Sequence, residues 1–105
     1  KAFETENARK KAIQTQLAKM ITPNDVMVMP TSPAPAPMLT EPEANLNDFR
    51  MRSFEMLCPA GLGGLPQLSI PAGGVDGGPV GLSLVGAKDQ DRQLISLGIA
   101  MDKAL

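Results

Sequence analysis

The sequence predicts an α/β segment that is incomplete as an independent domain. Two stretches with helical periodicity, near the beginning and the end of the 105 residues, flank a middle in which short apolar runs alternate with turn formers. All of the 10 Gly and 10 Pro except Gly98 lie between residues 23 and 86. The chain has 3 Phe and neither Tyr nor Trp, and its 7 Met fill only part of the core volume that aromatic side chains usually occupy. A small chain with so few core fillers is a weak candidate for folding alone.

The first element is an amphipathic helix, expected over residues 2–20. Ile13, Leu17, Met20 and Ile21 recur at helical spacing, while the basic residues nearby fall on the rest of the helical wheel. The helix is expected to stop before Pro23.

A short strand and a Pro-rich loop follow. The apolar run from Val26 to Met29 predicts a strand over residues 25–29 that is covered on both faces, as is usual in a parallel sheet. The prolines after it fix φ and push their predecessors out of the helical region, so residues 30–46 are expected as a Pro-rich loop. This loop is a rigid connector or, as the alternative, a PxxP ligand for an SH3-like domain.

A second helix is expected over residues 48–58, with Asn47 or Asp48 as its cap and an end before Pro59. Cys58 follows an apolar helix face and has no histidine partner in the chain, so a buried thiol is expected there.

A β-hairpin is predicted over residues 67–86. Residues 67–72 and 80–85 alternate with period two, and the glycine-rich stretch between them contains an Asp-Gly turn signal, which indicates a loop of about five to seven residues. Leu68 and Ile70 should share one apolar face with Leu82 and Leu84. A last helix is expected over residues 90–105, capped by an Asp and carrying an apolar stripe.

The composition excludes several functions for this chain alone. It has no His, which removes Ser-His-Asp catalysis and His-ligated zinc, and no Ser is followed three residues later by Lys. The glycines match neither a P-loop nor GxGxxG, so no cofactor is expected. A net charge of −1 gives no footprint for nucleic acid, and no apolar run is long enough to cross a membrane. We expect a cytoplasmic protein, because one Cys cannot form an intrachain disulfide.

Three ordered motifs carry a resemblance to a known family. They are DVMVMPTSP at 25–33, AGLGGLPQLSIPAG at 60–73 and GPVGLSLVG at 78–86. In order and spacing they resemble the C-terminal end of the amidase signature family, over about residues 5–105. The family usually has Asn at the position of Gly61, and Ala is common at the position of Gln67. At these two positions the chain is more similar to the plant-type indole-acetamide hydrolase branch and its chloroplast import-receptor relatives.

The resemblance implies the C-terminal part of a large mixed β-sheet covered by helices, with the apolar hairpin face covered by helices from the rest of the protein. Family members hydrolyse carboxylic amides with a Ser-Ser-Lys triad, which would lie outside these residues, so no catalytic residue is assigned here. The expected partners are the remainder of the amidase chain and a small amide, with a homodimer of the full-length enzyme as a further expectation. Some import-receptor relatives have lost catalysis, so a non-catalytic scaffold or receptor module remains the alternative, and an independent Pro-rich interaction domain is a third.

This segment is expected to shape the acyl pocket with four residues. Thr31 and Ser32 follow the buried strand, at the edge where open α/β sheets place their ligands. Phe54 and Leu57 lie on the helix that lines the acyl channel in family members. The alternatives are a hydroxyl cap of the turn for Thr31 and Ser32, and ordinary core packing for Phe54 and Leu57.

Overall fold

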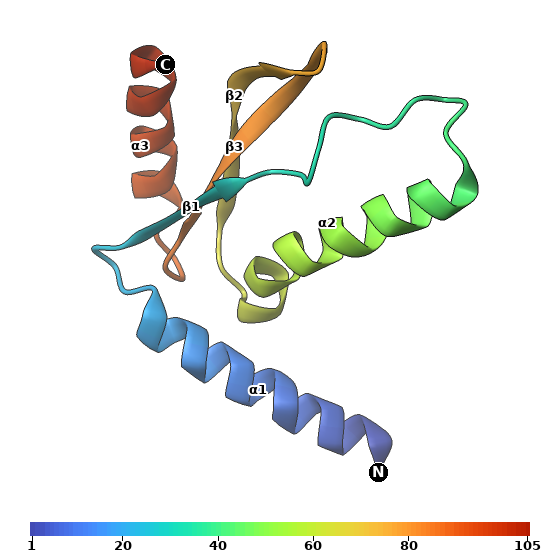
Figure 1. Cartoon of the computed structure of the whole chain (residues 1–105). Helices are drawn as coiled ribbons and strands as arrows, with labels where there is room; N and C mark the ends of the chain where they lie inside the picture. The colour runs from blue at the N-terminus through green and yellow to red at the C-terminus, as the bar shows by residue number, and fades with distance from the viewer.

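A computed structural model describes all residues 1–105 as three helices and one three-stranded antiparallel sheet (Figure 1). The sheet has the order β1-β3-β2, so the last strand lies in the middle. The chain is an open layer with extents of 43 × 39 × 16 Å. Its radius of gyration, 16.0 Å, exceeds the ~13 Å of a compact domain of this length. The elements are α1 (Ala2–Met20), β1 (Val26–Pro30), α2 (Glu43–Gly63), β2 (Gln67–Val75), β3 (Gly78–Gly86) and α3 (Asp91–Ala104).

The hairpin of β2 and β3 has the predicted shared face. Leu68 pairs with Leu84 and Ile70 pairs with Leu82, which places these four side chains on one face. Helix α3 covers this face so closely that a Cβ at Gly98 would clash with Leu68 Cδ2. Leu84 is fully buried there, and Leu94 of α3 is also buried. The expectation that helices outside this chain cover the hairpin face is therefore wrong, because the glycine lets α3 approach it.

The opposite face of the sheet carries a second small core. Val85 and Ala87 are buried with Ile21, which follows α1, and Ala60 of α2, while Met27, Met29 and Leu65 pack around them. Helix α1 reaches this core only through its C-terminal end and otherwise extends away from the sheet (Figure 1). It spans the predicted residues, but its apolar stripe is covered only in part, since Leu17 is half-buried and Ile13 is exposed.

Strand β1 differs from the expected strand with two covered faces. It pairs antiparallel with β3 at the edge of the sheet, and its residues alternate between exposed and half-buried. Met27 and Met29 face the core just described, whereas Val26 and Val28 point to the other side and are exposed. The reason is that α3 packs on β2 and β3 and does not extend over β1.

Helix α2 is longer than predicted at both ends. It begins at Glu43, where Asn45 and Leu46 donate their backbone N–H groups to the Pro42 carbonyl, and it continues through Pro59 to Gly63. The Pro-rich loop is correspondingly shorter, ending at Pro42. Gly64 caps the end of the helix, and its left-handed φ of 67° lets Leu65 N–H reach the Ala60 carbonyl at 2.9 Å. The loss of one N–H at Pro59 is tolerated because the following residue, Ala60, is anchored in the core.

The hairpin turn is shorter than the predicted loop. The strands continue to Val75 and Gly78, which leaves a two-residue turn with positive φ at Asp76 (49°) and Gly77 (78°). These values fit the type I′ turn, whose twist matches that of a hairpin. The register shifts between Pro71 and Gly74, which places the proline at an irregularity of the edge strand β2, as its missing N–H requires.

Two smaller differences concern α3 and the Pro-rich loop. Gln90 precedes α3 without a side-chain cap, and neither Asp89 nor Asp91 caps it: Asp89 has a positive φ and Asp91 lies in the first turn. The loop packs against the hairpin, since a Cβ at Gly78 would lie 2.6 Å from Pro35 Cβ. The Pro-rich loop thus lies against the sheet at Pro35.

Candidate functional site

The end of β1 carries a cluster of three hydroxyl groups. Thr31 Oγ1 lies 2.7 Å from Ser69 Oγ of β2 and 2.8 Å from Ser83 Oγ of β3. The backbone N–H of Thr31 also donates to the Gly81 carbonyl at 3.0 Å, which fixes the position of the side chain. Ser83 is fully buried, Thr31 is half-buried and Ser69 is exposed. The cluster therefore runs from the interior of the sheet to its surface.

Gly81 makes room for this cluster. A Cβ at this position would lie 2.7 Å from Ser69 Oγ and 2.9 Å from Thr31 Oγ1, both closer than normal contact distances. Thr31 was predicted as a site residue from the sequence, but its two serine partners were not. Their signal was a Ser at an alternating position of each hairpin strand, with a Gly two residues before Ser83.

Ser32 lies beside an open groove between the Pro-rich loop and the hairpin. The groove has a volume of about 310 Å³, and its lining includes Ser32, Pro33, Ala72 and Leu82 together with Gly81. The hydroxyl of Ser32 donates to the Ala34 carbonyl at 2.7 Å. It thus stabilises the turn into the loop, whereas the Thr31 hydroxyl bonds across the sheet.

Phe54 and Leu57 lie together in a separate groove on the surface of α2. This groove, of about 330 Å³, is also lined by Arg50, Ser53 and Cys58. Phe54 is 56% exposed and Leu57 38% exposed, so neither is packed into a core of this chain. Cys58 is exposed as well, which corrects the expectation of a buried thiol. Its face of α2 points away from the core that Ala60 enters. The two grooves share no lining residue.

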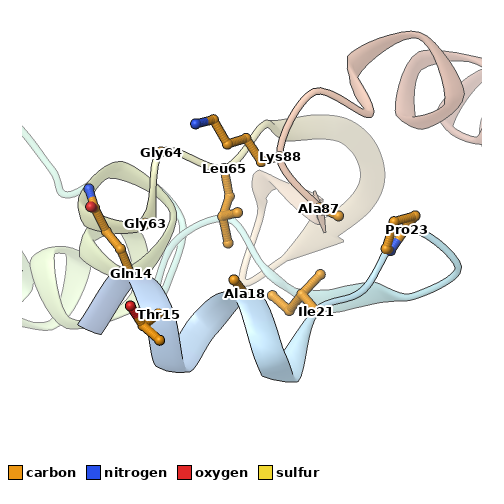
Figure 2. A pocket seen from close by; sticks show the side chains of 10 residues that line it. All are labelled: Gln14, Thr15, Ala18, Ile21, Pro23, Gly63, Gly64, Leu65, Ala87 and Lys88. Atoms are coloured by element: carbon orange, nitrogen blue, oxygen red, sulfur yellow. The ribbon is translucent and has the colours of Figure 1, made fainter. Parts of the chain in front are cut away.

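A further hollow lies where α1 meets the end of α2. Figure 2 shows its lining, which comes from α1, the residues around Gly64 and the segment after β3, and its volume is about 470 Å³. Gln14 Nε2 donates to the Leu62 carbonyl at 2.8 Å and joins the two helices there. The only ionisable group in the lining is Lys88, so the hollow is a packing gap between helices without a set of reactive groups.

The charged groups of the chain give no further site. Asp25 is the one titratable residue with a shifted pKa: the hydroxyl and the backbone N–H of Thr22 both donate to its carboxylate and lower its pKa below 3.8. No group of three or more His, Cys, Asp or Glu is placed to hold a metal ion. The helices are too short or too polar to cross a membrane.

Comparison with known proteins gives this arrangement its context. The profile of the amidase family matches residues 1–95. The chain belongs to the amidase family. This amidase segment is 40% identical to Amidase 1 of Arabidopsis thaliana over 88 residues, which are 84% of the chain and 21% of that protein. It is 34% identical to Amidase 1 of Oryza sativa over 96 residues, which are 91% of the chain and 22% of that protein.

A solved structure agrees with this assignment. A crystal structure of an amidase matches 98% of the amidase segment with a TM-score of 0.83 and 27% identity, and the match takes up 25% of that chain. The segment thus spans about a fifth to a quarter of the length of these relatives. Its fold is a part of the amidase fold.

Proposed function

We propose that this chain works as a C-terminal part of a longer amidase that hydrolyses a small carboxylic amide to the acid and ammonia. The supporting observation is the family match over residues 1–95, together with relatives named Amidase 1. In the reaction, a serine oxygen attacks the amide carbon, the C–N bond breaks with release of ammonia, and water then cleaves the acyl ester. The Ser-Ser-Lys triad for these steps lies outside these residues in our proposal.

The role proposed for this segment is to shape the acyl pocket. Thr31 and Ser32 sit where β1 ends, and Thr31 is held by three hydrogen bonds that leave it little freedom. Such a fixed polar group can orient a ligand without losing side-chain entropy on binding. Phe54 and Leu57 expose apolar surface along one groove of α2, which suits an apolar or aromatic acyl group.

The remainder of the amidase chain is the partner that we propose for the exposed apolar surface. Val26 and Val28 are exposed beside the region that α3 covers, and Met20 is 64% exposed at the end of α1. Covering such side chains contributes roughly 25 cal/mol for each Å² of apolar surface buried. The segment would then complete the sheet of a larger domain.

The test is hydrolysis by the full-length protein that carries this segment. Purified protein is incubated with phenylacetamide and with simple alkyl amides, and the released ammonia is measured. We expect Phe54→Ala to raise KM for phenylacetamide by about tenfold, since aromatic pairs contribute roughly 0.5–1.5 kcal/mol beyond their area. Phe3→Ala is the matched control, because Phe3 is 80% exposed at the start of α1. An unchanged KM in the Phe54 variant would remove this residue from the pocket.

A non-catalytic scaffold or receptor module is the second candidate. It is favoured by Gly61 and Gln67, which resemble the import-receptor relatives. In this case the full-length protein lacks the catalytic serines and releases ammonia from no amide. Ammonia release that depends on a serine outside this segment excludes the scaffold.

A further inference from the structure

The three hydroxyl groups at the end of β1 form a chain with a fixed direction of donation. Ser83 is fully buried, so no group outside this chain reaches it, and Thr31 Oγ1 is the one hydrogen-bond partner of its hydroxyl. If Thr31 donated to Ser83, the Ser83 proton would have no acceptor in a dry site, which is costly. Ser83 therefore donates to Thr31.

The proton of Thr31 then goes to Ser69. A hydroxyl has one proton and two acceptor lone pairs, and Thr31 Oγ1 has Ser69 Oγ as its other partner at 2.7 Å. If both serines donated to Thr31, the proton of this half-buried threonine would be left without an acceptor. Donation thus runs from Ser83 through Thr31 to Ser69. The Ser69 hydroxyl already accepts one bond, and its own proton has no acceptor in this chain.

We infer that the Ser69 hydroxyl donates a hydrogen bond to an acceptor oxygen in the acyl part of the substrate. This inference rests on the proposed function, because it requires the end of β1 to face the acyl pocket. Ser69 lies at the exposed end of the hydroxyl chain and beside Gly81, which leaves room for the Ser69 and Thr31 hydroxyls and also lines the groove beside Ser32. Each bond in such a chain polarises the next, so the terminal hydroxyl is a stronger donor than an isolated serine.

The site would therefore select among amides by the polarity of the acyl group. A pocket built to donate to an oxygen discriminates against an analogue that lacks it, because the donor is then left unpaired. Ser69 thus adds a specificity-determining contact, while Thr31 and Ser83 are positioning residues that orient it.

The experiment compares amides that differ only in one oxygen. Primary amides whose acyl chains carry an ether oxygen at successive positions are each paired with the analogue that has a methylene at that position. For the full-length protein, we expect at least one ether to be preferred over its methylene analogue in KM. In Ser69→Ala this preference should fall by roughly two- to tenfold, the range for one neutral hydrogen bond. Ser96→Ala is the control, because Ser96 is exposed on α3 and makes no hydrogen bond with its side chain.

Each outcome decides the inference. If the wild-type protein prefers no ether, or if the preference persists in Ser69→Ala, the inference is wrong while amide hydrolysis still stands. If the wild-type protein hydrolyses none of the amides, the proposed function fails, and calorimetric binding of the same pairs replaces the kinetic readout. A binding preference that depends on Ser69 then supports the donor role without catalysis. Binding without such a dependence, or no binding, overturns it.

Discussion

Adding a methyl group at Gly81 should break the hydroxyl cluster and leave the rest of the sheet intact. The new Cβ would lie 2.7 Å from Ser69 Oγ, 2.9 Å from Thr31 Oγ1 and 3.3 Å from Thr31 Cβ. Ser69 can escape by rotating its side chain. Thr31 cannot move as easily, since a β-branched side chain has few rotamers and the Thr31 N–H is bonded to the Gly81 carbonyl.

The expected magnitude is the difference of two effects. Loss of the bonds to Thr31 leaves the buried Ser83 hydroxyl without a partner, which costs about 1–3 kcal/mol. Replacing Gly with Ala within a strand stabilises the folded state by about 0.5–1 kcal/mol, because Ala loses less backbone entropy on folding. We therefore expect Gly81→Ala to lower the free energy of unfolding by about 1 kcal/mol, the difference between the midpoints of these two ranges.

The assay is urea unfolding of the full-length protein, in which a shift of the midpoint at constant slope reports stability alone. Gly61→Ala is the matched control: Gly61 lies inside α2, and a Cβ there meets nothing within 4 Å. Alanine at this helical position should raise stability by up to about 1 kcal/mol. If Gly81→Ala were as stable as the wild-type protein while Gly61→Ala gained stability, the close contacts around Gly81 would not hold.

Three further predictions follow from single features of the fold. Leu84→Ala should cost about 2–5 kcal/mol, because Leu84 is fully buried between β3 and α3. Leu39→Ala, at a fully exposed position, should stay within about 0.5 kcal/mol, and equal effects of the two variants would contradict the described core. Gly77→Ala should destabilise by about 1–2 kcal/mol, because φ is 78° in the hairpin turn, and a neutral effect in urea unfolding would exclude the type I′ turn. Asp25→Asn should reduce the loss of thermal stability on acidification. The pKa of Asp25 is lowered in the folded state, so its contribution is present above about pH 3.8 and is lost as the pH falls through the folded-state value. An acid profile equal to that of the wild-type protein would show that the Thr22 contacts do not persist in solution.

Local signals in the sequence were sufficient for the helix α1 and for the pairing of the hairpin. The spacing of Ile13 and Leu17 and the stop before Pro23 depend only on neighbouring residues, and α1 ends where they predict. The period-two alternation of the hairpin fixes which side chains share a face, so Leu68 and Leu84 lie on the same face as expected. The order of the three motifs was enough to indicate the amidase family, which the family match then showed.

Other features depend on contacts that no local pattern contains. Helix α2 passes through Pro59 because Ala60 is held in a core formed with Val85, and a rule based on the proline alone ends the helix too early. Strand β1 was expected to be covered on both faces because its apolar run is short and continuous, but coverage depends on where α3 packs.

The hydroxyl cluster shows most clearly which features depend on local sequence and which depend on tertiary contacts. The sequence by itself determined that Thr31 follows a strand, that serines alternate along the hairpin and that the chain carries amidase motifs. Only the tertiary structure decided that Thr31 meets Ser69, 38 residues away, and Ser83, 52 residues away. The physical reason is that side chains of three strands become neighbours through sheet order and register, which are set by the packing of the whole layer and not by any one strand.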